Sequence, residues 1–404
     1  MAVGLQAIEG LPAIPGVELA FGYSGIRKKT ADDTLIMRWS EGASVAATFT
    51  RNAFCAAPVH VSRAHLGKRP RALVVNAGNA NAGTGDRGMR DAQSSCDVLA
   101  SSVGIDADQV LTFSTGVIFE PLPIDKLSQG IRALAPKLAE QSWDGAAKAI
   151  MTTDTLPKGV SAQVEIDGKL ITLNGIVKGA GMIRPNMATM LAFMATDAAV
   201  DQAALQRLLS HSVDQSFNVI TVDSDTSTND SCVLIATGNA GNSLLDESHA
   251  QWSVFANTVE ALALSLAQAL VRDGEGATKF IEICVEGALS VDEARIVGFE
   301  VAHSPLVKTA IFAEDPNLGR LLMAIGKAPI KALDVSKVNL WLGDLAVVLN
   351  GEPHPDYAEA TASQIMQAED LLIRIDLGRG ESDASVWTCD LSHDYVSINA
   401  DYRS

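Results

Sequence analysis

The segment from Lys178 to Thr196 constrains the fold more than any other part of this 404-residue chain. It reads KGAGMIRPNMATMLAFMAT, in which two glycines and a proline oppose regular structure and an apolar run follows directly. The pattern predicts an irregular, exposed loop, followed by a buried strand that begins at Thr189. The fold must therefore bring a short polar loop to the very start of a buried strand.

This layout is the one that an N-terminal nucleophile enzyme needs. Such an enzyme cuts its own chain before Ser, Thr or Cys by an N-to-O acyl shift, which leaves a hydroxyl or thiol beside a free α-amino group. A threonine hydroxyl is a weak nucleophile, but an α-amine with a pKa of about 7.7 to 8.0 can take its proton. The seven histidines lie in no triad motif, and no HExxH pattern indicates a metal.

Strand patterns and helix patterns mix along the whole chain, without a linker or a repeat between them. Strands are expected where Val, Ile and Leu gather, at residues 72–76, 109–114, 218–222, 232–237, 279–285 and 371–377. A further pair of strands, 164–166 and 170–173, flanks Asp167-Gly168, a dipeptide that suits a tight hairpin turn.

Two helices are indicated by their periodicity and end signals. Apolar residues recur every three or four positions from Phe255 to Leu270, which is typical of a helix that covers a core. Another helix is expected to begin at Asp315-Pro316 and to end near Gly326. Hairpins mixed with helices favour an α+β fold, in which helices cover sheets in layers, over a purely parallel sheet.

Composition excludes several classes of protein. The net charge of −17 opposes binding to nucleic acid or to an anionic membrane, and 47% hydrophobic residues can build a large core. The N-terminal residues carry no pattern of a secretion signal, and no apolar run reaches the length of a membrane span. The five cysteines form no CxxC pair, as expected in a reducing compartment. We expect a soluble, cytoplasmic protein.

Three other segments carry more polar detail than packing requires. Asn76 to Gly85, NAGNANAGTG, is either a phosphate cradle or a tight structural turn, and it lacks the lysine of GxxxxGK[ST]. Thr115-Gly116 could aim a hydroxyl and an amide at an oxyanion, or it could simply form a turn. Met151 to Lys158, MTTDTLPK, is either the wall of a polar pocket or the exit of a helix.

Taken together, these segments closely resemble the ornithine acetyltransferase family of arginine biosynthesis, the glutamate N-acetyltransferases. The resemblance covers nearly the whole chain, and the block around KGAGMI and PNMATML is its most specific part. Two positions depart from the family pattern: Phe119 stands where glycine is usual, and Leu318 where tryptophan is usual. The other matching segments are FTRNAFCAAPV, NAGNANAGTG, STGVI, MTTDT, DSDTSTNDS, DGEGATKF, EDPNLGR and YVSINADYRS.

The resemblance implies self-cleavage between Ala188 and Thr189, which gives an α chain of residues 1–188 and a β chain of residues 189–404. Thr189 is then the nucleophile, and Thr115 with Gly116 matches the oxyanion hole of the family. The positions that match the substrate-binding residues of the family are Thr155, Lys178, Thr189, Glu275, Asn399 and Ser404.

Each of these binding positions has a simpler alternative. Lys178 could be a solvated loop charge, and Glu275 a loop residue after a helix. Asn399 and Ser404 could belong to a frayed tail, as most C-termini do. An amino-acid substrate nevertheless needs a cation, an anion and hydroxyl or amide groups, which this set supplies.

The implied reaction moves an acetyl group from N2-acetyl-ornithine to glutamate through an acetyl-threonine ester, with ping-pong kinetics. Some members of the family also use acetyl-coenzyme A, and no adenine or pyrophosphate motif in this sequence decides that point. No metal or other cofactor is required. Two alternatives remain: an N-terminal nucleophile amidase or aminopeptidase that releases the acyl group to water, and an uncut ligand-binding protein.

The implied fold is a layered α/β/β/α sandwich of the N-terminal nucleophile type, with a smaller C-terminal α/β part. The chains 1–188 and 189–404 are expected to stay intertwined in this one fold and to assemble as an α2β2 heterotetramer.

Overall fold

The computed structural model describes residues 2–27, 31–184 and 190–400. The chain divides into two compact units. Residues 6–218 and 225–270 are called the sandwich unit here, and residues 1–5, 219–224 and 271–404 are called the C-terminal unit. Each unit has its own sheets and its own hydrophobic core.

Two mixed sheets lie at the centre of the sandwich unit, with strand orders β1-β2-β4-β5 and β3-β9-β8-β7-β6 in the described residues. The pairs β4–β5 and β8–β9 are parallel, and the other neighbours are antiparallel. The strands are β1 Val17–Gly22, β2 Thr34–Trp39, β3 Ser44–Phe49, β4 Ala72–Asn79, β5 Val110–Val117, β6 Lys158–Ile166, β7 Lys169–Lys178, β8 Leu191–Thr196 and β9 Ser231–Ala236.

These two sheets pack face to face, because alternate residues of their strands meet in one apolar cluster. At its centre the ring of Phe113 from β5 meets the ring of Phe193 from β8 edge-on, with centroids 5.2 Å apart. The opposite face of the first sheet is apolar too: Ile36 and Val74 point away from that cluster and are buried under helices.

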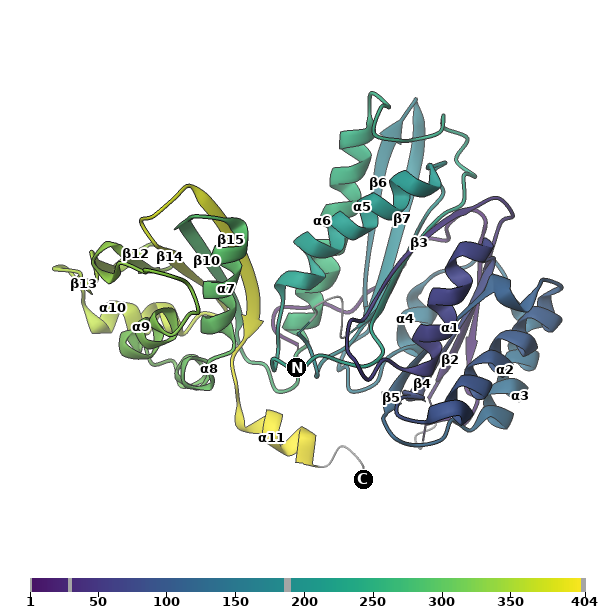
Figure 1. The fold of residues 1–404 in the computed structure, drawn as a ribbon, viewed down its shortest axis with the longest axis horizontal. Coiled ribbons are helices and arrows are strands. Elements are labelled where there is room, and N and C mark those ends of the chain that lie inside the picture. Colours follow the sequence, from purple (N-terminus) through teal and green to yellow (C-terminus); the bar gives the residue numbers. More distant parts are fainter. Residues whose placement is uncertain (1, 28–30, 185–189, 401–404) are drawn as a thin grey trace. The chain divides into compact units, whose positions relative to one another are not determined.

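Helices cover both outer faces of the sandwich unit (Figure 1), so the layers run α/β/β/α and the expected sandwich is confirmed. α1, α2 and α3 pack on the first sheet, and α5 and α6 pack on the second. The bounds are α1 Ala57–His65, α2 Gly85–Val103, α3 Ile124–Leu134, α4 Asp144–Ala149, α5 Gln202–Gln215 and α6 Trp252–Arg272.

Among the described residues, α6 is the one helix that is long and apolar enough to cross a membrane. Its most apolar stretch is 56% buried within the protein. Leu262 and Leu266 of this helix lie so close to Gly175 of β7 that a Cβ atom at Gly175 would meet Leu266 at 2.5 Å. Contact with the sheet therefore accounts for the apolar side of α6, as its periodicity predicts.

The hairpin predicted at Asp167-Gly168 is also confirmed. β6 and β7 pair antiparallel up to Ile166 and Lys169, and the two turn residues have φ values of 53° and 68°. Both angles lie in the left-handed region that a two-residue turn of this type requires.

The C-terminal unit is built on one mixed sheet of order β13-β12-β11-β14-β10-β15, covered by α7 to α10. This is the smaller α/β part that the resemblance implies. The bounds are β10 Phe280–Ala288, β11 Asn339–Leu342, β12 Leu345–Leu349, β13 Glu352–Pro353, β14 Asp370–Asp376, β15 Ser382–Cys389, α7 Val291–Ala302, α8 Pro305–Phe312, α9 Leu318–Gly326, α10 Glu359–Met366 and α11 His393–Ala400.

Two expectations about secondary structure are wrong in detail. Residues 218–222 form no strand and make only an isolated bridge, between Ile220 and Trp387 of β15. This short apolar run is buried where it passes beside β15, without a continuous ladder of hydrogen bonds. The helix expected from Asp315-Pro316 begins at Leu318 instead. Its cap is Asn317, whose side chain accepts a hydrogen bond from the Arg320 amide at 3.1 Å.

The remaining strand predictions agree with β4, β5, β9, β10 and β14 to within three residues at each end.

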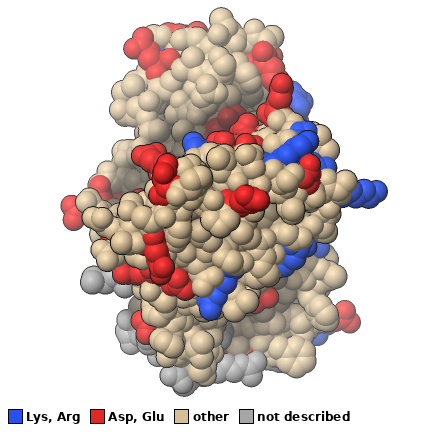
Figure 2. Space-filling model, turned by 90° about the vertical axis from the view of Figure 1, so that its left-hand side faces the viewer, with Lys and Arg blue, Asp and Glu red and all other residues tan. Residues whose placement is uncertain are grey.

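On the face drawn in Figure 2, Lys and Arg side chains are interspersed with Asp and Glu.

Candidate active site

The side chains of Lys178 and Thr115 meet inside the sandwich unit, although they come from different sheets. Lys178 ends β7 and Thr115 lies near the end of β5, and both are at least nine-tenths buried. Lys178 Nζ donates a hydrogen bond to Thr115 Oγ1 at 3.1 Å. Burial lowers the pKa of the Lys178 ammonium, against the charges of Asp154 and Asp230. The alternative of Lys178 as a solvated loop charge is therefore wrong.

Gly116, the other predicted oxyanion residue, occupies a position that no other residue fits. Its φ is 132°, and a Cβ atom there would lie 2.2 Å from the carbonyl carbon of Gly78. Gly78 itself has a φ of 129° and pairs with Gly116 across β4 and β5. Two glycines at this point let the two strand ends approach each other closely.

The asparagine side chains of NAGNANAGTG form hydrogen bonds within the fold. The first of them extend β4, and Asn76 accepts a hydrogen bond from the Ser114 hydroxyl at 2.5 Å. Asn76 in turn donates to the carbonyl of Asn79 at 2.8 Å, and Asn81 donates to the carbonyl of Gly88 at 2.9 Å. These contacts support the structural alternative for this segment over the phosphate cradle.

Asp154, from the segment MTTDTLPK, lies at the base of the same site. It is buried, and its Oδ1 accepts hydrogen bonds from Lys158 Nζ at 2.6 Å and from the Gly179 amide at 2.7 Å. Burial alone would favour the neutral acid, but the charges of Lys158 and Lys178 hold the pKa of Asp154 below its usual range. Asp154 thus ties MTTDTLPK to the backbone that follows Lys178. The sequence shows this Asp among three threonines without indicating its ion pair.

Asp230 is a second buried carboxyl group that the sequence does not single out. It directly precedes β9 and is 4% exposed. Burial raises the pKa of Asp230 well above its usual range, although the charge of Lys178 and hydrogen bonds from Ser227 and the Met190 amide act in the opposite direction. The site therefore holds two carboxyl groups whose pKa values are shifted in opposite directions, which is common at catalytic centres.

The predicted cleavage junction, Ala188 and Thr189, lies outside the described residues, as does Ser404. Met190, the next residue after Thr189 in the sequence, is buried, and Leu191 begins β8. Leu191 pairs with Lys178 on β7, so the strands on either side of the junction are neighbours in one sheet.

Thr155 is exposed, directly after the buried Asp154. Thr115, Gly116, Thr155 and Lys178 all belong to the sandwich unit.

Glu275 and Asn399 are brought together within the C-terminal unit. Asn399 lies on α11, and its Nδ2 donates to Glu275 Oε2 at 2.8 Å. Glu275 is 8% exposed, in the turn after α6, and Gly276 beside it has a φ of 71° that lets the chain pass close to the start of α11. The described part of the C-terminal tail is therefore anchored by this hydrogen bond. A frayed tail is the wrong description for Asn399.

The structure describes the surroundings of Phe119 and Leu318, the two residues that depart from the family pattern. Phe119 is 78% exposed and has a φ of 68°, a conformation that glycine adopts without strain. This explains why glycine is the usual residue there. Leu318 is the first residue of α9 and packs against the core of the C-terminal unit.

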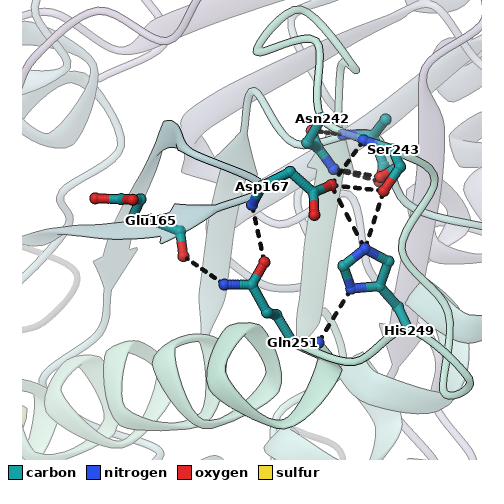
Figure 3. A network of polar contacts seen from close by, with 7 residues as sticks. Glu165, Asp167, Asn242, Ser243, His249 and Gln251 are labelled. Carbon is teal, nitrogen blue, oxygen red and sulfur yellow. Dashed lines mark hydrogen bonds and ion pairs between the residues drawn. The ribbon is translucent and has the colours of Figure 1, made fainter.

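A serine, a histidine and an aspartate also gather elsewhere in the sandwich unit, beside the turn between β6 and β7 (Figure 3). Ser243 Oγ lies 2.5 Å from Asp167 Oδ2 and 2.9 Å from His249 Nε2. The backbone N–H of Gln251 donates to His249 Nδ1 at 3.1 Å, so the neutral ring carries its hydrogen on Nε2. His249 therefore cannot accept the proton of Ser243. The hydrogen bonds of this cluster hold the turn between β6 and β7, and the cluster is not a catalytic triad.

Comparisons with known proteins give one consistent result. The model of the ArgJ family matches residues 18–404. The arginine biosynthesis bifunctional protein ArgJ of Methylococcus capsulatus is 52% identical over 391 residues, which are 97% of this chain and 96% of the relative. The protein of the same name from Pseudomonas fluorescens is 49% identical over 407 residues and the full length of both chains.

A solved structure adds to this result. The crystal structure of the arginine biosynthesis bifunctional protein ArgJ from Bacillus halodurans is similar with a TM-score of 0.51 and 39% sequence identity. The match covers 52% of this chain but 99% of that one. The solved chain is thus about half as long as the chain described here.

Proposed function

This chain belongs to the ArgJ family, and on that premise we propose that it is an acetyltransferase of arginine biosynthesis. It moves the acetyl group of N2-acetyl-L-ornithine to L-glutamate and so yields ornithine and N-acetylglutamate. The observation that carries this proposal is the hydrogen bond between Lys178 and Thr115, next to a glycine that admits no side chain. Support also comes from the two relatives, each named for arginine biosynthesis and each matched over nearly its whole length.

The chain first cuts itself between Ala188 and Thr189, giving an α chain of residues 1–188 and a β chain of residues 189–404. The solved relative supports this division. The match covers 99% of the solved chain but only 52% of this sequence, as expected if the solved chain is one of the two pieces of a cut precursor. β7 and β8 pair along their length, so the two chains share one sheet and stay together after the cut.

Thr189 then attacks the acetyl carbonyl, and its own α-amine takes the hydroxyl proton. The Thr115 hydroxyl and the Gly116 amide stabilise the oxyanion. Because Lys178 Nζ already donates to Thr115 Oγ1, the hydrogen of that hydroxyl is directed elsewhere and is available for the oxyanion. Ornithine departs, and the amine of glutamate attacks the acetyl-threonine ester in a second step, so the kinetics are ping-pong.

The residues proposed to bind the substrates are Thr155, Lys178, Thr189, Glu275, Asn399 and Ser404. Lys178 supplies a cation for a carboxylate, and Glu275 supplies an anion for an ammonium group. The hydrogen bond between Asn399 and Glu275 supports a shared role for these two residues. The cut protein requires no cofactor, assembles as α2β2 and acts in the cytoplasm.

The word bifunctional in the names of the relatives supports a second activity, the formation of N-acetylglutamate from acetyl-coenzyme A and glutamate. Saturation of the initial rate by acetyl-coenzyme A would support this activity. A rate that stays at background at every concentration would rule it out.

Denaturing electrophoresis of the purified protein tests the cleavage. Two bands of about 20 and 23 kDa are expected, the larger with the N-terminal sequence TMLAFMATD. The variant Thr189→Ala should remain one full-length band and lack activity, because it has no hydroxyl to form either ester. A Thr189→Ala protein that still runs as two pieces would sink the assignment of the nucleophile.

Product analysis separates transfer from hydrolysis. Incubation with N2-acetyl-ornithine and glutamate should give N-acetylglutamate equal to the ornithine released. An equal amount of free acetate instead would identify an amidase.

A further inference from the structure

Arg27 is a further cation beside the candidate active site, and the reaction described above gives it no role. It lies in the segment between β1 and β2, and it is partly buried. Its Nε donates a hydrogen bond to the carbonyl of Ala77 at 3.3 Å. A Cβ atom at Gly78 would lie 3.0 Å from its Cγ. The side chain of Arg27 therefore lies against the last residues of β4.

The end of β4 is next to the two predicted oxyanion residues. Ala77 pairs with Thr115, and Gly78 pairs with Gly116, across the parallel strands β4 and β5. Neighbouring strands of a sheet are about 4.7–4.9 Å apart. The guanidinium group of Arg27 is thus hydrogen-bonded to one strand, and the proposed oxyanion donors belong to the strand beside it.

The backbone of Arg27 is held in place by a buried carboxylate. Asp33 is 0% exposed, and its Oδ2 accepts hydrogen bonds from the amides of Ile26 at 2.7 Å and Arg27 at 3.2 Å. Its Oδ1 accepts from the amide of Ser24 at 2.7 Å. These bonds fix the path of the chain from which the Arg27 side chain extends.

One nitrogen of the guanidinium group lacks an acceptor. Arg27 Nη2 is buried and has no hydrogen-bond partner within residues 2–27, 31–184 and 190–400. Buried donors are nearly always paired, and a guanidinium group keeps its charge at neutral pH. The geometry of its donors suits the two oxygens of a carboxylate. Nη2 therefore indicates an acceptor that the described residues do not supply.

Lys178 brings a second positive charge close to Arg27. The two groups interact electrostatically, and as like charges they repel one another. Asp154 is hydrogen-bonded to Lys158 at 2.6 Å, and the raised pKa of Asp230 favours its neutral form. Neither carboxyl group is thus reserved for the two cations. An anionic ligand near both would remove their repulsion.

Bond lengths indicate which group of the substrate this anion is. In both substrates of the proposed reaction, the reacting nitrogen is bonded to the carbon that carries the α-carboxylate. Three bonds join the acetyl carbonyl carbon to the α-carboxylate carbon, so the two lie within about 4 Å of each other. If Thr115 and Gly116 hold the oxyanion, the α-carboxylate must lie close to them. The side-chain ends of the substrates lie several bonds farther away.

We propose that Arg27 is a specificity-determining residue, whose guanidinium group binds the α-carboxylate of both substrates together with Lys178. Nη2 supplies one of the donors. The side chains of ornithine and glutamate end in opposite charges, but the α-carboxylate is common to both. One cation can therefore place the reacting nitrogen in both half-reactions. The inference rests on the acetyl transfer proposed above.

The test measures KM and kcat of Arg27→Met for N2-acetyl-ornithine and for glutamate. Methionine keeps much of the apolar length but loses the charge and every donor. A hydrogen bond between charged groups changes affinity by about ten- to hundredfold. We expect both KM values to rise at least about tenfold, with a smaller change in kcat. Values of KM within threefold of the unaltered enzyme would overturn the proposal.

A pair of inhibitors separates binding from damage to the fold. L-Ornithine and 1,4-diaminobutane differ only in the carboxylate. The ratio of their inhibition constants measures how much the site gains from that group. In Arg27→Met this ratio should fall at least tenfold, because the variant has less to gain. An unchanged ratio would show that Arg27 acts only on the structure, and it would overturn the proposal even if KM rises.

Arg38→Met is the matched control. Arg38 lies on β2 of the same sheet, is partly buried, and donates a hydrogen bond to Glu18. This variant loses the same charge from the same unit, and it should keep both KM values within about twofold. If it raises them as much as Arg27→Met does, the effect comes from net charge and the proposal is wrong.

The remaining outcomes separate this proposal from the proposed function. An unaltered protein that transfers no acetyl group to glutamate would overturn the proposed function. An active unaltered enzyme, with Arg27→Met unchanged in KM, would overturn only the role of Arg27. If Arg27→Met does not fold, Arg27→Gln replaces it, since glutamine keeps a polar end without the charge. Its inhibitor ratio should fall at least about fivefold, and an unchanged ratio would again overturn the proposal.

Discussion

Two polar clusters of the sandwich unit contain the residue types of a hydrolase site, but their surroundings differ. Around Lys178, Thr115, Asp154 and Asp230 the charged groups are buried, and the pKa values of Lys178 and both aspartates are shifted. Around Ser243 the groups are more exposed, and each hydrogen bond holds a turn.

The comparison teaches that residue identity is a poor guide to chemistry. The serine beside His249 faces a ring nitrogen that carries a hydrogen, so it has no base. The threonine beside Lys178 is held by a donor, so its own hydrogen is available. Burial and the direction of the hydrogen bonds separate the two clusters, and substitutions in each can break or sharpen that distinction.

Thr115→Val should have the largest effect. The side chain keeps its shape but loses the hydroxyl, so kcat should fall by about 10² or more, as for other oxyanion donors. Steady-state kinetics of the cut protein measure this loss. Thr115→Ser keeps the hydroxyl and should retain most of the activity. A valine variant within threefold of the unaltered kcat would place the oxyanion elsewhere.

Asp154→Asn should chiefly affect stability. The change leaves Lys158, which is 1% exposed, without its anionic partner, and breaking such a buried pair costs about 3–5 kcal/mol. Denaturant unfolding measures the loss. Adding Lys158→Met removes the unpaired charge and should recover most of the stability. If the double variant is as unstable as the single one, the ion pair is not the cause.

The same variant should change the response to acid. The pKa of Asp154 is lower in the folded protein than the usual value of about 3.9 in an unfolded chain. Its stabilisation is therefore fully present above about pH 4 and is lost as the pH falls toward the folded-state pKa. Asp154→Asn should flatten this part of the curve of unfolding free energy against pH. An unchanged slope would show that other carboxyl groups control it.

Ser243→Ala should have the smallest effect. In the described structure its hydroxyl hydrogen-bonds only to Asp167 and His249. We therefore expect kcat to stay within about twofold and Tm within about 2 °C. Activity assays and thermal unfolding measure both. A tenfold loss of activity would contradict the distinction between the two clusters.

Much of the fold could be predicted because short-range signals control it. The turn at Asp167-Gly168 requires positive φ angles at two adjacent residues, and the period of α6 requires one apolar face. The strand prediction at 218–222 is wrong. An apolar run of this kind is typical of a strand, but here it forms only a single bridge to β15. It also misplaced the start of α9 by two residues, since two possible caps, Asp315 and Asn317, lie close together.

The sequence by itself determined the family of this chain, the positions of several of its strands and of the helix α6, and most of the residue types at the site. The tertiary structure alone decided that Lys178 contacts Thr115, that Asp154 pairs with Lys158, and that Asp230 keeps one oxygen without a described partner. The physical reason is distance along the chain. Lys178 and Thr115 are 63 residues apart, and only the packing of two sheets brings them together in a buried space, where burial lowers the pKa of the Lys178 ammonium.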